Sequence, residues 1–449
     1  MSITGKNIQP GTSKALMPSA YKLRSIDMSN HRGIIKDIQN IITKMEITES
    51  LFSPTLILKL SIQDNNNLIE EFEICGQETI RIRIAYQLLD TGIERELDLS
   101  FFITEYPNYG RVDQRTQAYT MVGISEQSYL SNFKKISRAF SNNTALEIQN
   151  IYTNELNCPA DKFFIRGESI TTMKGIINTQ TPIQACMWLL GQTTDDNYTP
   201  FFLYQALDGS YNLTSLKQLL DDGDNTLYQT YFWTTGFKGD PMSEEDYIER
   251  ATRILEINSN LGRGKINQAK GGAFASQNRY LDISQKTFTN TQYNYTTDFI
   301  KTNSLERTNA LSSNFTLASD TLDQYKDAHL EHISTNKDAW DGILLNYNNN
   351  SIKTKHFLNA YSSLLDTYEH DLKLNGDFGL NPGRKVKLQI PKAIDPTIYK
   401  EYSGKSAIYL YDEVISGTYL VTSVIHSFED NEYYSNVRVK RDSLSLKLQ

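Results

Sequence analysis

Alternation of apolar and polar side chains is the strongest pattern in the first third of the chain. Every second residue is apolar in the segments 56–62, 80–84 and 97–103, and most residues between them are polar or charged. A two-residue period over such lengths predicts β-strands with one buried and one solvated face. Turn-forming Asp, Asn, Thr and Gly residues separate these segments. Because consecutive strands with short turns usually pair antiparallel, we expect a β-barrel or β-sandwich over residues 34–125.

The same pattern returns at the C-terminal end. Val386, Leu388 and Ile390 alternate with polar residues. Residues 417–441 contain two extended runs separated by Asp430-Asn431, which predicts a β-hairpin with one apolar and one polar face. The chain therefore begins and ends with a β-rich domain.

The central part of the chain mixes helix and strand patterns. Thr181-Pro182 is typical of a helix start, because a hydroxyl N-cap is followed by Pro at the first helical position. Residues 287–318 are rich in Thr, Asn and Ser, which predicts irregular or edge-strand structure. We expect an α+β region with an extended stretch after Gly271-Gly272, two short strands around Asp208-Gly209, a helix after them, and helices over residues 129–140, 144–155, 182–190, 243–260 and 354–366.

These patterns divide the chain into consecutive parts. The first 33 residues mix Gly and Pro with polar residues and have no period, so we expect an arm that is ordered only against a partner or another domain. A length of 449 residues agrees with about three domains. The expected parts are an N-terminal arm (1–33), a first tube-like β-barrel (34–128), an α+β domain (129–240), a mixed region with helices and interface segments (241–370) and a second tube-like β-barrel (371–449).

Composition narrows the class of protein. The net charge of -8 argues against a chain-wide basic surface for nucleic acid. No apolar run is long enough for a transmembrane helix, and we expect no secretion signal at the N-terminus. Cys75, Cys158 and Cys186 are widely spaced, which favours reduced thiols and synthesis in a cytosol. An apolar fraction of 39% that includes 27 tyrosines suits a β-rich structural protein better than a compact α/β enzyme.

No cluster of residues indicates catalysis. His329 and His332 stand three residues apart in DAHLEHI and could share a helix face, but a zinc site of this kind needs H-E-x-x-H and further ligands. A solvated polar face is the better interpretation. The GRGK sequence at 262–265 lacks the spacing of a phosphate-binding loop, and no G-x-S-x-G or cysteine nucleophile signature occurs. No carboxylate pair is marked as a glycosidase pair. We therefore expect no catalytic, cofactor-binding or metal site.

Four blocks of sequence carry a resemblance to a known family. Residues 42–84 contain an opening strand, an E-S-L-F-x-P turn, an acidic turn and a G-x-E-x-I strand. Residues 181–220 contain a helix, an aromatic strand, a D-G turn and an S-L-x-x-L segment. The segments 271–288 and 372–391 with 416–444 complete the series. In this order and spacing, the blocks resemble the baseplate hub proteins of contractile-tailed bacteriophages, of the T-even type and its cyanophage relatives.

The resemblance covers the chain from about residue 40 to 444 and departs from the family at two places. Arg384 and Lys385 stand where an acidic residue often follows the glycine. Residues 287–350 match poorly. These departures bear on local contacts rather than on the family.

The resemblance implies a homotrimeric ring at the centre of the tail baseplate. Each subunit would carry two tail-tube-like barrels, so that three chains imitate a six-fold ring between the hexameric tail tube and the trimeric central spike. The channel would carry the tape measure protein and then DNA, and baseplate wedge proteins are further partners. DNA in transit needs no base contacts and gains nothing from a strongly basic lining, so an acidic chain is compatible. We expect a non-enzymatic, β-rich α+β protein of the virion, synthesised in the bacterial cytoplasm.

The same symmetry argument predicts an internal duplication. A trimer that meets a six-fold tube needs two equivalent docking units per chain, so residues 34–125 and 372–446 should form similar barrels with most strands in the same order. If the two segments had unrelated topologies, or packed into one shared sheet within a chain, the symmetry-adaptor mechanism would fail even for a tail component. We expect the trimer interfaces to come largely from strand edges and loops of the two β-domains. The α+β region would clamp neighbours and meet the spike.

Two other classes of function stay open. A tail-associated hydrolase of wall or surface glycan would need turnover that depends on one carboxylate. A host-surface adhesin would need specific binding by the isolated protein, and the sequence has no repeats or β-helical tracts of the usual kind. A related contractile injection machine is a nearer alternative to a phage, although its spikes usually fuse a long tip to the hub.

Overall fold

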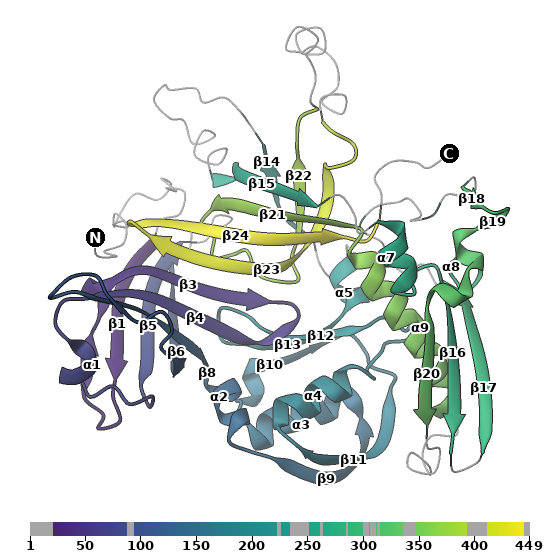
Figure 1. The fold of residues 1–449 in the computed structure, drawn as a ribbon, viewed down its shortest axis with the longest axis horizontal. Helices are drawn as coiled ribbons and strands as arrows, with labels where there is room; N and C mark the ends of the chain where they lie inside the picture. The colour runs from purple at the N-terminus through teal and green to yellow at the C-terminus, as the bar shows by residue number, and fades with distance from the viewer. Residues whose placement is uncertain are drawn as a thin grey trace, which may run out of the picture.

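The fold is described from a computed structural model of the chain. The described residues are 21–87, 94–221, 226–233, 251–260, 264–283, 286–299, 305, 311, 315–335, 347–392 and 411–443. Figure 1 shows a β-rich body in which the first strands (purple) lie beside the last hairpin (yellow), with an α+β domain (blue to teal) below them and a peripheral part (green) at one end. Within the described residues, no helix is long and apolar enough to cross a membrane.

Six strands form the first β-unit. Their spatial order is β3-β4-β8-β6-β5-β1, and every neighbouring pair is antiparallel. The short strands β2 and β7 are attached at β1 and β8. The six strands are β1 (Tyr21–Ser29), β3 (Ile42–Ser50), β4 (Ser53–Asp64), β5 (Thr79–Gln87), β6 (Glu94–Glu105) and β8 (Gln117–Ser125), and the short elements are β2 (Ile35–Asp37), β7 (Gly110–Arg111) and the helix α1 (Leu68–Glu71).

Six more strands form the second β-unit. Their order is β15-β21-β24-β23-β22-β14, and a bridge between Phe232 and Arg253 brings the end of β14 back to the start of β15. All pairs are antiparallel except β14 with β22, which is parallel. The strands are β14 (Leu227–Phe232), β15 (Ile254–Asn260), β21 (Tyr368–Asn375), β22 (Lys385–Gln389), β23 (Gly417–Glu429) and β24 (Glu432–Arg441).

The two β-units have the same strand order. If the six strands of each unit are numbered along the chain, both sheets run two, three, six, five, four, one. The predicted common order is therefore present. The one difference in direction concerns the first strand, because β14 runs parallel to its neighbour whereas β1 runs antiparallel.

The two units also share the positions of their irregularities. The ladder of the fifth and sixth strands shifts register at Thr104 in the first unit and at Thr422 in the second. The Thr104 hydroxyl donates to the carbonyl of Val122 at 3.2 Å, and the Thr422 hydroxyl donates to the carbonyl of Arg438 at 3.1 Å. The ladder of the second and third strands shifts after Ile42 and, correspondingly, after Ile254. Matched bulges on matched strands indicate one architecture used twice.

One expectation about these units is wrong. They do not form separate sheets, because β23 pairs antiparallel with β3 and joins both units in one 14-stranded sheet. The physical reason is that β3 and β23 would otherwise leave open edges of backbone donors and acceptors, and pairing satisfies both edges. Each unit nevertheless has a main apolar cluster of its own, although Phe378, Phe428 and Tyr433 of the second unit pack in the cluster of the first.

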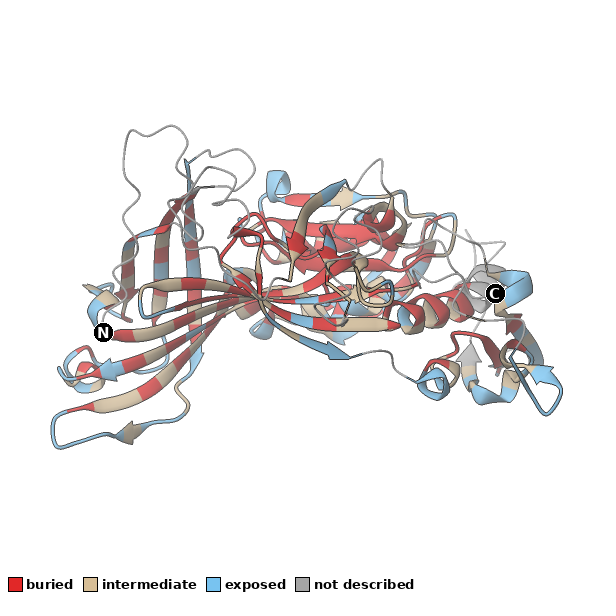
Figure 2. Cartoon of the chain, turned by 90° about the horizontal axis from the view of Figure 1, so that it is seen from above, coloured by how far each residue is buried: buried red, intermediate tan, exposed pale blue. Residues whose placement is uncertain are grey.

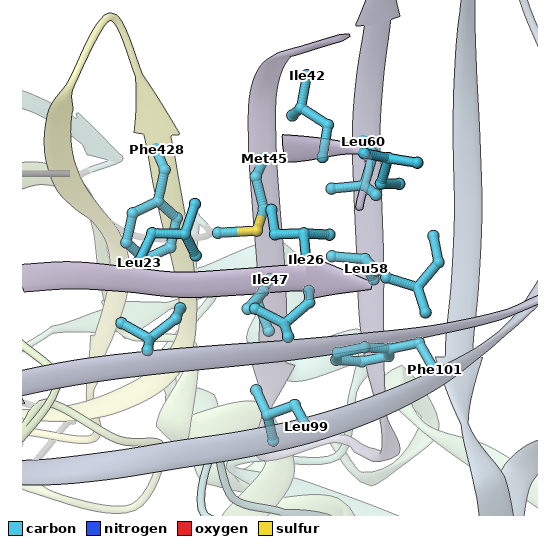
Figure 3. Packing of buried hydrophobic residues seen from close by; sticks show 14 of the residues in the cluster. Leu23, Ile26, Ile42, Met45, Ile47, Leu58, Leu60, Leu99, Phe101 and Phe428 are labelled. Carbon is cyan, nitrogen blue, oxygen red and sulfur yellow. The ribbon is translucent and has the colours of Figure 1, made fainter. Parts of the chain in front are cut away.

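Strict alternation builds both cores. Along β4 the side chains of Leu56, Leu58, Leu60 and Ile62 are buried in turn, as the two-residue period predicts. Figure 2 shows this banding of buried and less buried residues along the strands. In Figure 3, Phe428 from the β23–β24 hairpin lies beside Leu23 and Met45, so the last hairpin covers one end of the first core.

An α+β domain lies between the two units in sequence and has a core of its own. The predicted helix at Thr181-Pro182 is confirmed as α4, with a capping box in which the Thr181 hydroxyl accepts from the Gln184 N–H. The predicted strands around Asp208-Gly209 and the helix after them are also confirmed. Its elements are α2 (Glu126–Asn132), β9 (Ile136–Asn143), α3 (Thr144–Glu155), β10 (Phe163–Arg166), β11 (Thr172–Gln180), α4 (Pro182–Leu190), β12 (Phe201–Gln205), β13 (Tyr211–Ser215) and α5 (Leu216–Leu220).

A peripheral part is inserted between the second and third strands of the second unit. Its three-stranded sheet has the order β17-β16-β20, with β17 at an edge as the sequence predicted for this polar stretch. The helix predicted over 354–366 is part of the longer α9. The elements are α7 (Lys265–Lys270), β16 (Ala275–Asp282), β17 (Thr287–Asn294), α8 (Tyr295–Asp298), β18 (Thr316–Leu317), β19 (Asp320–Thr321), β20 (Leu330–Thr335) and α9 (Tyr347–Leu365).

Three expectations are corrected by these elements. The arm expected over 1–33 does not extend to its end, because residues 21–29 are strand β1; residues 1–20 lie outside the described residues. The helix expected over 129–140 is α2 followed by strand β9. In the helix expected over 243–260, the described end is strand β15, and residues 243–250 lie outside the described residues. The strands β14 and β15 thus extend the second β-unit beyond the expected range 371–449.

Candidate functional site: the joint between the two β-units

The joint is the place where strand β23 changes its partner. Along one edge, residues 417–420 pair with β22, whereas residues 423–429 pair with residues 44–50 of β3. The bulge at Thr422 lies between these two stretches. A bulge bends its strand and increases the local twist, so it can turn the second half of β23 away from its own unit and toward the first.

A carboxylate and an imidazole meet inside the joint. Glu49 continues the inward row of β3 after Met45 and Ile47, and His426 lies between Val424 and Phe428 on the inward row of β23. The Glu49 Oε1 atom lies 3.0 Å from His426 Nε2, and both side chains are fully buried. A buried pair of this kind stabilises a joint only if its remaining polar atoms also have partners.

Those partners come from three parts of the chain. The other Glu49 oxygen accepts the backbone N–H of Leu207, from the β12–β13 turn of the α+β domain, at 3.0 Å. His426 Nδ1 lies 2.7 Å from the hydroxyl of Tyr433 on β24. Burial raises the pKa of Glu49, and the hydrogen bond from His426 opposes this shift. The pair therefore ties both β-units and the α+β domain together at one point.

A second buried carboxylate supports the joint from the side of the second unit. Asp377 Oδ2 accepts the Tyr228 hydroxyl at 2.8 Å, and Oδ1 accepts the Gly379 N–H at 2.8 Å. Burial raises the pKa of Asp377. The preceding residue, Gly376, lies so close to the Tyr433 ring that a Cβ atom would stand 2.0 Å from a ring carbon. Only glycine fits there, which holds the Asp377 loop against the joint.

Aromatic rings fill the space around these polar groups. The Phe378 ring lies 4.5 Å from the Tyr86 ring of the first unit and 4.5 Å from the Tyr433 ring of the second. The Phe428 ring is 5.1 Å from Tyr21 and stacks on Tyr433 at 4.5 Å. Such ring pairs contribute roughly 0.5–1.5 kcal/mol each beyond the area they bury. The joint is thus packed like a protein core rather than like a hinge.

The outward face of the joined sheet carries mixed charges. Lys44 Nζ lies 2.9 Å from Glu46 and 3.6 Å from Glu429, so one of these ion pairs crosses the joint. Three further basic side chains on this face also lie near carboxylates: Lys373 with Glu256 at 3.2 Å, Arg438 with Asp371 at 2.8 Å, and Lys440 with Asp366 at 2.6 Å. These four cations are already neutralised within the chain, which lowers their attraction for phosphates.

The candidate histidines, His329 and His332, lie in the peripheral part of the molecule. His329 directly precedes β20 and His332 lies in that strand, so they do not share a helix face; the i, i+3 spacing puts them on opposite faces of a strand. His329 Nδ1 lies 2.6 Å from the Lys270 carbonyl oxygen. Lys265 begins α7, and residues 262 and 263 lie outside the described residues. Within the part of the chain that the structure describes, no group of three metal-ligating side chains occurs.

The buried pair Glu49 and His426 was missed by the sequence analysis. A signal was present, because each residue occupies an inward position of an alternating strand, where a titratable side chain is costly unless it is partnered. Their pairing was not visible, since 377 positions separate them.

Comparison with solved structures identifies the fold. No protein-family model and no curated protein sequence matches the chain. The 43 kDa tail protein of prophage MuSo2 from Shewanella oneidensis is similar, with a TM-score of 0.52 and 12% identity over 94% of this chain and 99% of that one. A tail protein from Neisseria meningitidis has a TM-score of 0.51 and 9% identity over 94% of this chain and 97% of that one. Along nearly its whole length, the chain has the fold of these tail proteins.

Proposed function

We propose that this protein is the central hub of a contractile phage tail baseplate. In this role, three copies form a ring that adapts the hexameric tail tube to the trimeric central spike and forms part of the DNA channel. Its partners are a second and third copy, the spike protein and the tail tube protein, with the wedge and tape measure proteins as further contacts. The protein acts in the virion and without catalysis.

The internal duplication carries this proposal. Two units with one strand order and matched bulges at Thr104 and Thr422 lie side by side in a single chain. A ring of three such chains presents six similar units, which is the number that a six-fold tube requires. The α+β domain occurs once per chain and supplies a face with three-fold repetition.

The sheet shared by the two units is the result that was named above as contradicting a symmetry adaptor. It does not merge the units, because each keeps its own complete strand order and a main apolar cluster, although Phe378, Phe428 and Tyr433 of the second unit pack in the cluster of the first. Only part of one strand, residues 423–429 of β23, crosses to the neighbouring unit. Edge pairing between neighbours also supports a closed wall, since it leaves fewer open edges in the ring.

The charge pattern of the joined sheet supports passage of DNA. A strong row of free cations would hold phosphates, and each phosphate contact would add a salt-dependent attraction. The cations at Lys44, Lys373, Arg438 and Lys440 are instead paired with carboxylates. We infer that this outward face lines the channel and lets DNA slide.

The mass of the full chain in solution, alone and with candidate spike protein, tests this proposal. We expect a homotrimer that binds one trimeric spike. A well-folded monomer that stays monomeric across a concentration series and on the spike contradicts the hub role. Turnover of peptidoglycan or capsule polysaccharide by the purified chain favours the hydrolase, and specific binding to host cells by the isolated chain favours the adhesin.

A further inference from the structure

Each β-unit has one strand edge without a described strand partner at a place where the corresponding edge of the other unit is paired. In the first unit, β3 uses one edge for β4 and the other for β23. Its counterpart in the second unit is β15, which pairs with β21 on one edge and ends the path of the 14-stranded sheet. Within the described residues, the other edge of β15 carries only the bridge from Arg253 to Phe232. Glu256, Asn258, Ser259 and Asn260 are exposed there.

The second open edge follows the bulge of the first unit. The counterpart of residues 423–429 is the stretch from Glu105 through β7 to Val112. The ladder between β5 and β6 ends at the pair of Thr79 with Phe102. The next hydrogen bond on this edge of β6 runs from the Ile103 N–H to the Glu78 carbonyl. Beyond it, the described ladders of this stretch lead to β8. Tyr109 and Val112 are 56% and 62% exposed beside this edge, so a strand that pairs there can cover them.

We propose that these two edges bind each other between copies of this chain. The stretch 105–112 of one copy adds to the β15 edge of the next copy, as residues 423–429 add to β3 within the chain. This inference rests on the proposed function and names the surface that closes the ring. Each copy carries one edge of each kind, so the contact is heterologous and closes into a ring when the rotation between copies is one third of a turn.

The matched ladders set the register of the proposed contact. Lys44 and Glu256 each follow the shift in their strands, so they correspond. Gly110 faces Ala118 of β8, as Ser427 faces Tyr434 of β24. Within the chain, Glu429 is opposite Lys44 and Ser427 is opposite Glu46. The correspondence therefore places Val112 opposite Glu256, and Gly110 opposite Asn258, of the next copy.

A second copy is the occupant that the observations favour. The two edges are complementary for the same reason that β23 and β3 are, since each member belongs to the corresponding strand of the other unit. A net backbone hydrogen bond contributes about 0.5–1.5 kcal/mol, so a short ladder alone is weak. Three identical contacts in a closed ring reinforce each other, and burial of Tyr109 and Val112 adds apolar area to each of them.

A pair of engineered cysteines tests the register in the full chain. Cys75 is exposed, whereas Cys158 and Cys186 are buried, so Cys75→Ser provides the background. In that background, Val112→Cys with Glu256→Cys puts two thiols directly opposite each other across the proposed ladder, at a Cβ separation that suits a disulfide. The matched control is Val112→Cys with Ser259→Cys, which is three residues out of register and faces the other side of the strand.

Mild oxidation should convert the Val112→Cys/Glu256→Cys protein to a covalent trimer on a non-reducing gel, while the control stays mainly uncrosslinked. The uncrosslinked mass of the Cys75→Ser background is measured in parallel, alone and on the spike. A non-covalent trimer that gives no cross-link, or equal cross-linking in the control, overturns this interface but leaves the hub role in place. A covalent dimer as the end product contradicts ring closure. A protein that never forms trimers overturns both the interface and the hub role.

Discussion

The two β-units share an architecture but differ in what they bury. The charged side chains that the first unit buries are carboxylates, at Glu49, Asp64 and Glu78, each at most 1% exposed, and the rest of its interior is mainly apolar. The second unit buries His370, Lys385 and Arg441, each at most 1% exposed. The Arg441 guanidinium donates to the carbonyls of Val414 and Ser416 and lies between the rings of Tyr368 and Tyr419. Strand order and bulges are thus set by backbone pairing, whereas the chemistry of the interior is free to diverge.

The two units also differ in the segments that connect their strands. The first unit has short connections, while the second is interrupted by the peripheral part between β15 and β21 and follows the α+β domain directly. Lys385 reaches the Leu220 carbonyl of α5 at 3.4 Å, so one of the buried cations fastens the second unit to its neighbour. Buried polar groups therefore fasten both units to the α+β domain, through Lys385 in the second unit and through Glu49 in the first.

The largest expected effect is a loss of stability when the buried pair that joins the two units is removed. Glu49→Ala leaves His426 and the Leu207 N–H without their buried partner, which should lower the free energy of unfolding by about 3–5 kcal/mol. Chemical denaturation of the full chain measures this loss. The matched control is Glu46→Ala on the same strand, which removes only a surface ion pair with Lys44 and should cost about 0–1 kcal/mol. Equal losses in both variants would show that the buried pair does not hold the joint.

The next effect is a dependence of stability on pH that comes from the second unit. Burial, with the charge of Arg441 as a smaller cause, lowers the pKa of His370 to about 4, whereas an unfolded histidine titrates near 6.5. The folded state thus holds the neutral form, and its stability contribution is complete above pH 6.5 and is lost as the pH falls toward 4. The expected slope from this group is about 1.4 kcal/mol per pH unit.

The variant His370→Gln tests this assignment. It should reduce the slope of the stability profile between pH 6.5 and 4, as followed by denaturation at a series of pH values, and the remaining slope includes that of His356, whose pKa burial also lowers to about 4. His31→Gln, at an exposed position of the first unit, is the matched control and should leave the slope unchanged. An unchanged profile in His370→Gln would place the acid sensitivity elsewhere.

The smallest effect compares the matched bulges. Thr422→Val removes a hydrogen bond from a fully buried hydroxyl and should destabilise the protein by about 1 kcal/mol. Thr104→Val removes the corresponding bond at an exposed position, where water can replace the hydroxyl, so a smaller loss is expected. Denaturation midpoints measured side by side decide the order. A larger loss from Thr104→Val would mean that the two bulges do not have equivalent roles.

Register shifts and irregular spacing of buried residues also explain which strands were not predicted from the sequence. The period of two predicted β4, β5, β6 and the β23–β24 hairpin, because these strands alternate over long stretches. In β1, the shift between Leu23 and Ser25 breaks the period, and the strand was interpreted as the end of an arm that is ordered only against a partner or another domain. In β15, the shift after Ile254 leaves a spacing of three to Ile257, which imitates a helix. Strand β9 buries Ile136 and Phe140, four residues apart, and imitates a helix as well.

The candidate site was less predictable than the fold. Alternation places Glu49 and His426 on inward faces, but local pattern cannot show that β3 and β23 are neighbours. The partner of a strand depends on long-range pairing, and here the pairing joins the beginning of the chain to its end. The duplication was expected from the symmetry of the assembly, while the shared edge that unites the two units was visible only in the structure.

The most direct test of the account is an image of the assembled ring. Electron cryomicroscopy of the full chain, alone or on its spike, should show three chains with six β-units around one axis. Junctions within chains, between β23 and β3, should alternate with junctions between chains, between the 105–112 stretch and β15. A ring in which only three β-units surround the axis, or in which the second units face outward, would contradict the claim that one chain supplies two equivalent docking units.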